Sequence, residues 1–207
     1  SSISSTEYAA VGNPYPSAID IATFLGDQTN ISNTIYFWDH ATGTNTDYAT
    51  YTSGSGGTAG SGGVTPDAYV QVAQGFIVEA TGGSASSVVF ENDQRVSGNN
   101  IQFFKGRTET RERLWLNALS NAGNNQILVA FVPEATDGLD ALYDGKKLKG
   151  NPNFAFYSVL EDEDYAIQGL NTLLPEETKV IPLGIDLASP GEVRFELDSL
   201  DNWPNAY

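Results

Sequence analysis

Three closely spaced aspartates are the first residues that could do chemistry. Asp137, Asp140 and Asp144 lie in segment 136–145, which reads Thr-Asp-Gly-Leu-Asp-Ala-Leu-Tyr-Asp-Gly. Calcium is a hard cation that takes oxygen ligands, so this concentration of carboxylates indicates a calcium site, although the spacing is not that of an EF-hand. Aspartate also caps helices and turns, because its side chain accepts backbone N–H bonds. Both interpretations stay open, and calcium is the one cofactor that the sequence suggests.

Trp115 is the aromatic residue best placed to bind a ligand. Segment 113–119 alternates, which puts Arg113, Trp115 and Asn117 on one face of a strand and apolar residues on the other. If the first face is wet, Trp115 offers a ring on which a sugar could stack, with Arg113 beside it. The alternative is that Trp115 packs in the core against a second layer.

The sequence carries no catalytic motif, so we predict no catalytic residue. A Ser-His-Asp triad would have to use His40, the single histidine, with the adjacent Asp39. Adjacent side chains usually point apart, and no serine lies in a Gly-x-Ser-x-Gly elbow. A glycoside hydrolase or lyase remains an alternative, since such enzymes need only two carboxylates across a sugar.

Composition excludes several classes of function. The 207 residues include 26 Asp and Glu against 10 Lys and Arg, for a net charge of −16, and no Cys. Disulfides, thiolate nucleophiles and cysteine zinc sites are therefore excluded. The negative charge disfavours nucleic acid and anionic lipid as partners. No apolar run is long enough for a membrane helix, so we expect no membrane insertion.

Strand signals dominate the chain. Short runs rich in β-branched and aromatic residues are separated by turn residues; they lie at 34–38, 68–72, 75–80, 87–90, 113–119, 126–131, 154–159, 179–185 and 192–197. This pattern predicts an all-β fold, a jelly-roll-like antiparallel β-sandwich. We expect one domain over 1–207, or two tightly packed halves of about 1–110 and 111–207, with short helices at 17–25 and 138–144.

Segment 53–63 is the most biased stretch, Ser-Gly-Ser-Gly-Gly-Thr-Ala-Gly-Ser-Gly-Gly. It has no large side chain to bury against the entropy of ordering, which predicts a flexible surface loop. A phosphate-binding loop is disfavoured, because the Gly-Lys-Ser/Thr of nucleotide loops is missing.

The sequence resembles a β-rich region of large secreted and cell-surface proteins of the Bacteroidetes, found just upstream of the C-terminal sorting domain that the type IX secretion system reads. The resemblance begins at 12–20, Gly-Asn-Pro-Tyr-Pro-Ser-Ala-Ile-Asp, and continues in order over most of residues 12–200. Further matching segments are 35–38, 47–51, 72–78, 89–96, 113–117, 137–145, 167–170 and 180–184.

The resemblance implies location and class more than activity. Such regions are non-catalytic sandwich modules of adhesins, enzymes or surface components, so we expect a secreted, cell-surface structural or adhesive module. Expected partners are other copies of the chain, cell-surface components or a polysaccharide; the alternative is a carbohydrate-binding module assisted by calcium. Asp198-Ser199-Leu200 resembles an O-glycosylation site of this phylum, which would place a glycan on Ser199.

Overall fold

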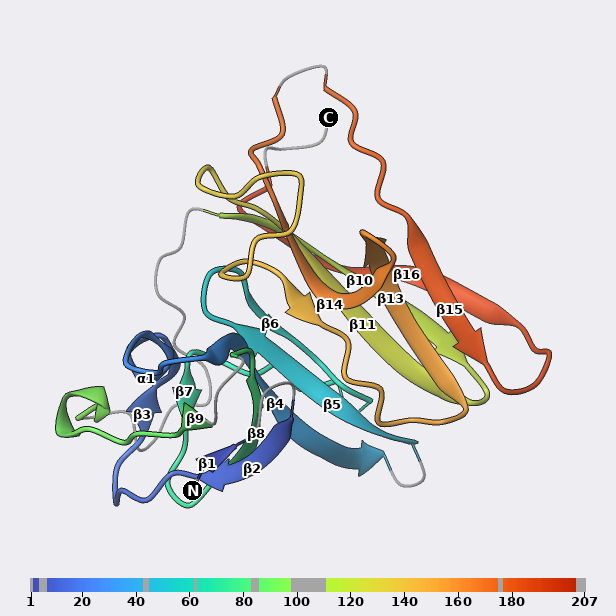
Figure 1. Cartoon of the computed structure of the whole chain (residues 1–207). Helices are drawn as coiled ribbons and strands as arrows, with labels where there is room; N and C mark the ends of the chain where they lie inside the picture. The colour runs from blue at the N-terminus through green and yellow to red at the C-terminus, as the bar shows by residue number, and fades with distance from the viewer. Residues whose placement is uncertain are drawn as a thin grey trace.

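The computed structural model describes residues 2–3, 7–42, 45–61, 63–82, 86–97, 111–174 and 177–203. Two larger sheets, one from each half of the chain, lie against each other (Figure 1). The first is antiparallel, in the order β2-β8-β4-β5-β6. Its strands are β2 (Tyr8–Gly12), β4 (Ile31–Thr42), β5 (Asn45–Thr52), β6 (Gly56–Thr58) and β8 (Gly75–Ala80).

The second sheet has the order β15-β13-β14-β11-β10-β16, with β12 also paired to β14. Its strands are β10 (Glu112–Ser120), β11 (Gly123–Phe131), β12 (Gly145–Lys146), β13 (Phe154–Leu160), β14 (Glu163–Leu170), β15 (Leu183–Leu187) and β16 (Val193–Asp201). Its pairs are antiparallel except β11 with β14. The predicted all-β, sandwich-like fold is confirmed.

Small elements cover the first sheet. They are β1 (Ser2–Ile3) with β9 (Ser86–Ser87), β3 (Ile19–Asp20) with β7 (Tyr69–Val70), α1 (Ile21–Gly26) and the 3-10 turn η1 (Asn92–Gln94). Asp20 caps α1 by accepting the Thr23 N–H at 2.8 Å, so the helix starts at Ile21, later than the predicted range of 17–25. Phe24 of α1 packs edge-to-face on Phe76 of β8, with ring centroids 5.4 Å apart. Among the described residues, no helix combines the length and apolar character needed to span a membrane.

The glycine-rich segment differs from the expected flexible surface loop, because residues 54–61 are buried and include β6. Here the backbone lies so close to neighbouring residues that no room is left for a side chain. A Cβ on Gly54 would lie 2.3 Å from the Leu142 carbonyl oxygen, and one on Gly57 would lie 2.3 Å from that of Pro66. The glycines therefore allow β6 to fit between the layers.

Segment 138–144 also differs, since it makes a single hydrogen-bonded turn rather than a regular helix. The backbone N–H groups of Tyr143 and Asp144 both donate to the carbonyl of Asp140, at 2.9 and 2.8 Å. The turn then leads directly into β12.

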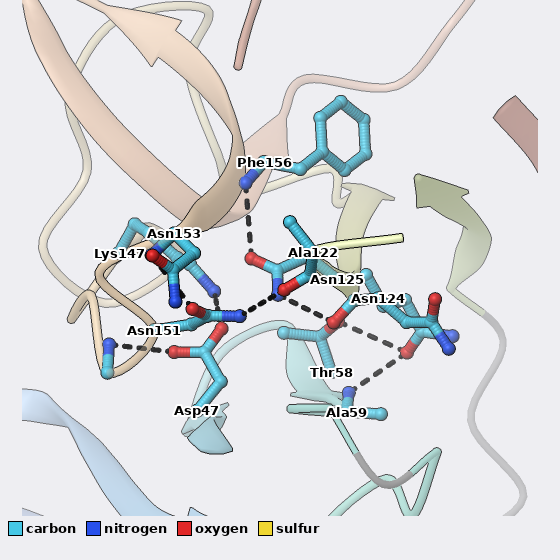
Figure 2. A network of polar contacts seen from close by, with 12 residues as sticks. Asp47, Thr58, Ala59, Ala122, Asn124, Asn125, Lys147, Asn151, Asn153 and Phe156 are labelled. Carbon is cyan, nitrogen blue, oxygen red and sulfur yellow. Dashed lines mark hydrogen bonds and ion pairs between the residues drawn. The ribbon is translucent and has the colours of Figure 1, made fainter. Parts of the chain in front are cut away.

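A polar network joins the two sheets (Figure 2). Gln126 of β11 accepts hydrogen bonds from the Thr58 hydroxyl and the Ala59 N–H, at 3.2 and 2.9 Å. Lys147 Nζ pairs with Asp47 Oδ2 of β5 at 2.6 Å, and these side chains are only 2% and 1% exposed. Buried polar groups that have lost their hydration cost free energy unless they are paired. The contacts of this network therefore favour the one arrangement of the two sheets in which the groups meet.

Candidate functional site

The outer edge of β16 is a candidate interaction surface. β16 pairs with β10 on one side, and within the described part of the chain no strand pairs with its other side. Phe195, Leu197 and Leu200 of β16 are 49%, 55% and 42% exposed. An edge strand offers unpaired backbone groups, and one that also exposes large apolar side chains can template pairing with another chain.

The β16 surface is shaped by one irregularity. The register between β10 and β16 shifts where Trp115 is opposite Ser199 and Leu116 is opposite Leu197, which leaves Asp198 as an extra residue. Asp198 accepts a hydrogen bond from Asn117 Nδ2 at 3.1 Å and one from Gln126 Nε2 at 3.2 Å. The shift therefore turns Asp198 back onto the sheet.

Trp115 lies at the contact between the sheets. Its indole N–H donates to the Gly57 carbonyl of β6 at 2.9 Å, and the ring packs against a cluster that contains Leu128 and Ile167. Arg113 covers the same ring at 5.4 Å from its centroid and pairs with Asp201 at 2.5 Å. The structure thus brings Trp115 and Arg113 together, with the ring engaged by protein groups on more than one side.

The three aspartates of segment 136–145 have separate partners. Asp137 pairs with Lys179 at 2.5 Å, and Asp140 accepts hydrogen bonds from the Thr136 backbone and hydroxyl at 2.5 and 2.7 Å. Asp144 accepts the N–H groups of Asp140 and Gly169, at 2.6 and 2.8 Å. Burial raises the pKa of Asp144 to about 6.

The contacts of Asp140 and Asp144 correspond to capping, the alternative that the sequence left open, whereas Asp137 forms an ion pair. Among the residues that the structure describes, no group of three or more Asp, Glu, His or Cys side chains has the arrangement to hold a metal. Calcium binding by the full chain stays a prediction.

Ser199 lies exposed on β16, and its hydroxyl donates to Asp198 at 3.4 Å. Glycosylation of Ser199 stays a prediction. A glycan on Ser199 would project from the same strand as Phe195 and Leu197. His40 is also exposed, near the end of β4.

A pocket in the first half of the chain contains a tryptophan that the sequence did not single out as a binding residue. The pocket, of about 170 Å³, is lined by Phe37, Trp38, Asp39, Ala49, Val64, Thr65, Pro66, Asp67, Tyr69, Gln71 and Gln74. Trp38 is 50% exposed and packs edge-to-face on Tyr48, with ring centroids 4.9 Å apart. The alternation of the strand bears on its position: Ile35 and Phe37 lie in the core of the first half, so Trp38 lies on the opposite face of β4.

Asp67 is the least satisfied polar group of this pocket. Its Oδ1 accepts the Tyr69 N–H at 3.0 Å, whereas its enclosed Oδ2 has no hydrogen-bond partner among the residues that the structure describes. Burial raises the pKa of Asp67, and the hydrogen bond from Tyr69 opposes that shift. A hydrogen-bond donor brought to this carboxyl would offset the cost of its burial.

The comparisons with known proteins give a family. The sequence model of a family described as a domain of unknown function (DUF8693) matches residues 2–205. No curated protein and no solved structure matches the chain.

Proposed function

We propose that this chain, which belongs to the DUF8693 family, is a non-catalytic structural or adhesive module of an exported protein and self-associates through β16. The observation that carries the proposal is the outer edge of β16, which no described strand covers, with its exposed Phe195 and Leu197. An added strand would satisfy the backbone groups of this edge and cover the apolar side chains.

The charge of the chain sets the conditions for self-association. Each copy carries a net charge of −16, so two copies repel each other at low ionic strength. Salt screens this repulsion, and calcium bound by carboxylates would reduce it further. We therefore expect assembly to increase with ionic strength, and calcium to promote it at a fixed ionic strength.

Export to the cell surface is supported by the resemblance and the composition. The resemblance is to regions of type IX secretion substrates, and a chain without Cys does not depend on the redox state of its compartment. Antibody labelling of intact cells that produce the parent protein tests this location. Detection only after lysis would contradict it.

Light scattering at several protein concentrations, with and without calcium, tests self-association. We expect species larger than the 22.2 kDa chain, and we expect Leu197→Lys to shift them towards monomer, because a lysine on an edge strand blocks strand addition. Leu174→Lys is the control, since Leu174 is 62% exposed but lies outside the strands. A wild-type chain that remains monomeric under all these conditions would contradict the proposal.

A further inference from the structure

We propose that the pocket lined by Trp38 binds a sugar ring that carries no acidic group. This binding site lies in the first half of the chain and does not involve β16. Ligand binding at this pocket is therefore independent of self-association through β16, and either proposal can fail without the other.

The aromatic side of the pocket is suited to a sugar. Trp38 and Tyr69 both line it, and half of the Trp38 side chain is open to solvent. The apolar face of a sugar ring packs on such an aromatic ring, which has a large contact area and few rotatable bonds. Aromatic residues combined with a few polar groups are the usual lining of a small-molecule site.

Trp38 is held in place before any ligand arrives. Tyr48 lies directly opposite it on β5 and packs against the ring. On another side, the backbone at Gly150 comes so close that an added Cβ would lie 3.1 Å from Trp38 Cζ3. Because neighbours already restrict the ring, little conformational entropy is lost on binding.

The polar side of the pocket sets the charge of the ligand. Asp39, Asp67, Gln71 and Gln74 line it, and no Lys or Arg is among the lining residues that the structure describes. Carboxylate and amide oxygens accept hydrogen bonds from sugar hydroxyls. The Asp67 carboxylate, whose Oδ2 has no hydrogen-bond partner in the described part of the chain, repels the charge of uronic acids and sulfated sugars. The preferred ligand is thus a neutral or amine-bearing sugar.

Titration of the chain with defined polysaccharides tests the site. The probes are a neutral β-glucan, a neutral mannan, chitosan as the amine-bearing polymer, and alginate as the acidic one. We expect binding to at least one of the first three, a change in tryptophan fluorescence on binding, and no binding to alginate. Trp38→Ala should weaken binding about tenfold or more, and Trp38→Phe should remove most of the fluorescence change.

Two further variants make the result specific. Tyr8→Ala removes an aromatic side chain that is 43% exposed and lies outside the pocket, so it should leave binding unchanged. The double variant Asp39→Asn with Asp67→Asn removes the two carboxylates, so it should gain measurable affinity for alginate. Circular dichroism confirms that each variant is folded.

Three results would overturn the proposal. The first is no binding to any probe at millimolar concentrations of sugar units. The second is unchanged affinity in the folded Trp38→Ala variant. The third is wild-type binding to alginate as tight as to the neutral polymers.

Discussion

At the scale of single residues, Asp144 links the turn before β12 to β14. Its carboxylate accepts backbone N–H groups from Asp140 and Gly169, which places it between a loop and a strand. It is 5% exposed, and burial raises its pKa from 3.8 to about 6. The folded chain therefore binds the Asp144 proton more tightly than the unfolded chain does.

Because of this pKa shift, the contribution of Asp144 to the stability of the fold depends on pH. The contribution to the free energy of unfolding is full below about pH 4 and falls as pH rises to about 6, because ionisation is then easier in the unfolded chain. Asp144→Asn cannot ionise but keeps one oxygen for the Gly169 N–H. We expect the stability of the wild type relative to this variant to decrease between pH 4 and pH 6 in urea unfolding. A difference that grows over this window would contradict the assignment.

What the sequence could predict at this scale depended on local signals. Capping by Asp140 and Asp144 was one of two open interpretations, because the same carboxyl oxygens suit calcium and backbone N–H groups. The partners of Trp115 could not be predicted, since its contact with Gly57 joins strands that lie far apart in the sequence. Alternation in β4 places Trp38 on the face opposite Ile35 and Phe37, but Tyr36 on that same face is fully buried, so the exposure of Trp38 did not follow from the pattern.

At the scale of elements, the glycine-rich segment is the clearest case of packing that overrides composition. Its composition predicts a flexible surface loop, because the segment has no large apolar side chains to bury. The structure shows that it is buried by others: the second sheet covers β6, and the Ser55 hydroxyl donates to the Tyr143 carbonyl at 2.6 Å. Small residues often indicate disorder, whereas in this segment they allow neighbouring backbone to approach closely.

A pair of glycine substitutions tests this view. Gly54→Ala should cost about 1–3 kcal/mol of stability or more, because its Cβ would overlap the Leu142 carbonyl oxygen and the Tyr143 ring. Gly26→Ala, at the end of α1, has no heavy atom within 4 Å of the new Cβ. It should be neutral or stabilising by less than about 1 kcal/mol. Equal effects in thermal unfolding would show that residue 54 is not packed as described.

Strand prediction was most accurate where alternation or β-branched residues marked the strand. Segment 113–119 was predicted and β10 spans Glu112–Ser120; 154–159 was predicted and β13 spans Phe154–Leu160. β14 is absent from the predicted strands, because its first residues, Glu163 and Asp164, belong to a run of four acidic residues, a composition that is rare in strands. The turn itself lies at Glu161 and Asp162, both with positive φ, as a tight hairpin requires.

At the scale of the whole molecule, the Asp47–Lys147 pair joins the half that contains the Trp38 pocket to the half that contains β16. Asp47 lies on β5 and also accepts the Gly150 N–H at 2.9 Å. The sequence could not indicate this pairing, since it joins residues a hundred positions apart and Lys147 carries the same charge as the exposed Lys146 and Lys149.

Removing one partner should therefore be costly. Lys147→Met leaves a buried carboxylate without its cation and should lower the free energy of unfolding by about 3–5 kcal/mol. Lys146→Met is the matched neighbour, because Lys146 is 44% exposed and pairs with Glu163 at 3.2 Å. That change should cost less than about 1 kcal/mol in urea unfolding. Similar losses in the two variants would contradict a special role for Lys147.

The burial of Lys147 has a chemical consequence as well. Amine-reactive reagents modify lysines that meet solvent, and Lys146 and Lys149 are 44% and 38% exposed, whereas Lys147 is 2% exposed. Brief acylation of the native chain would label Lys146 and spare Lys147, whereas Lys149 would react slowly because burial lowers its pKa less than its ion pairs with Asp164 and Asp186 raise it. Label on Lys147 would then show that the two sheets had separated. Acylation of Lys147 therefore measures whether the two halves of the chain are packed together.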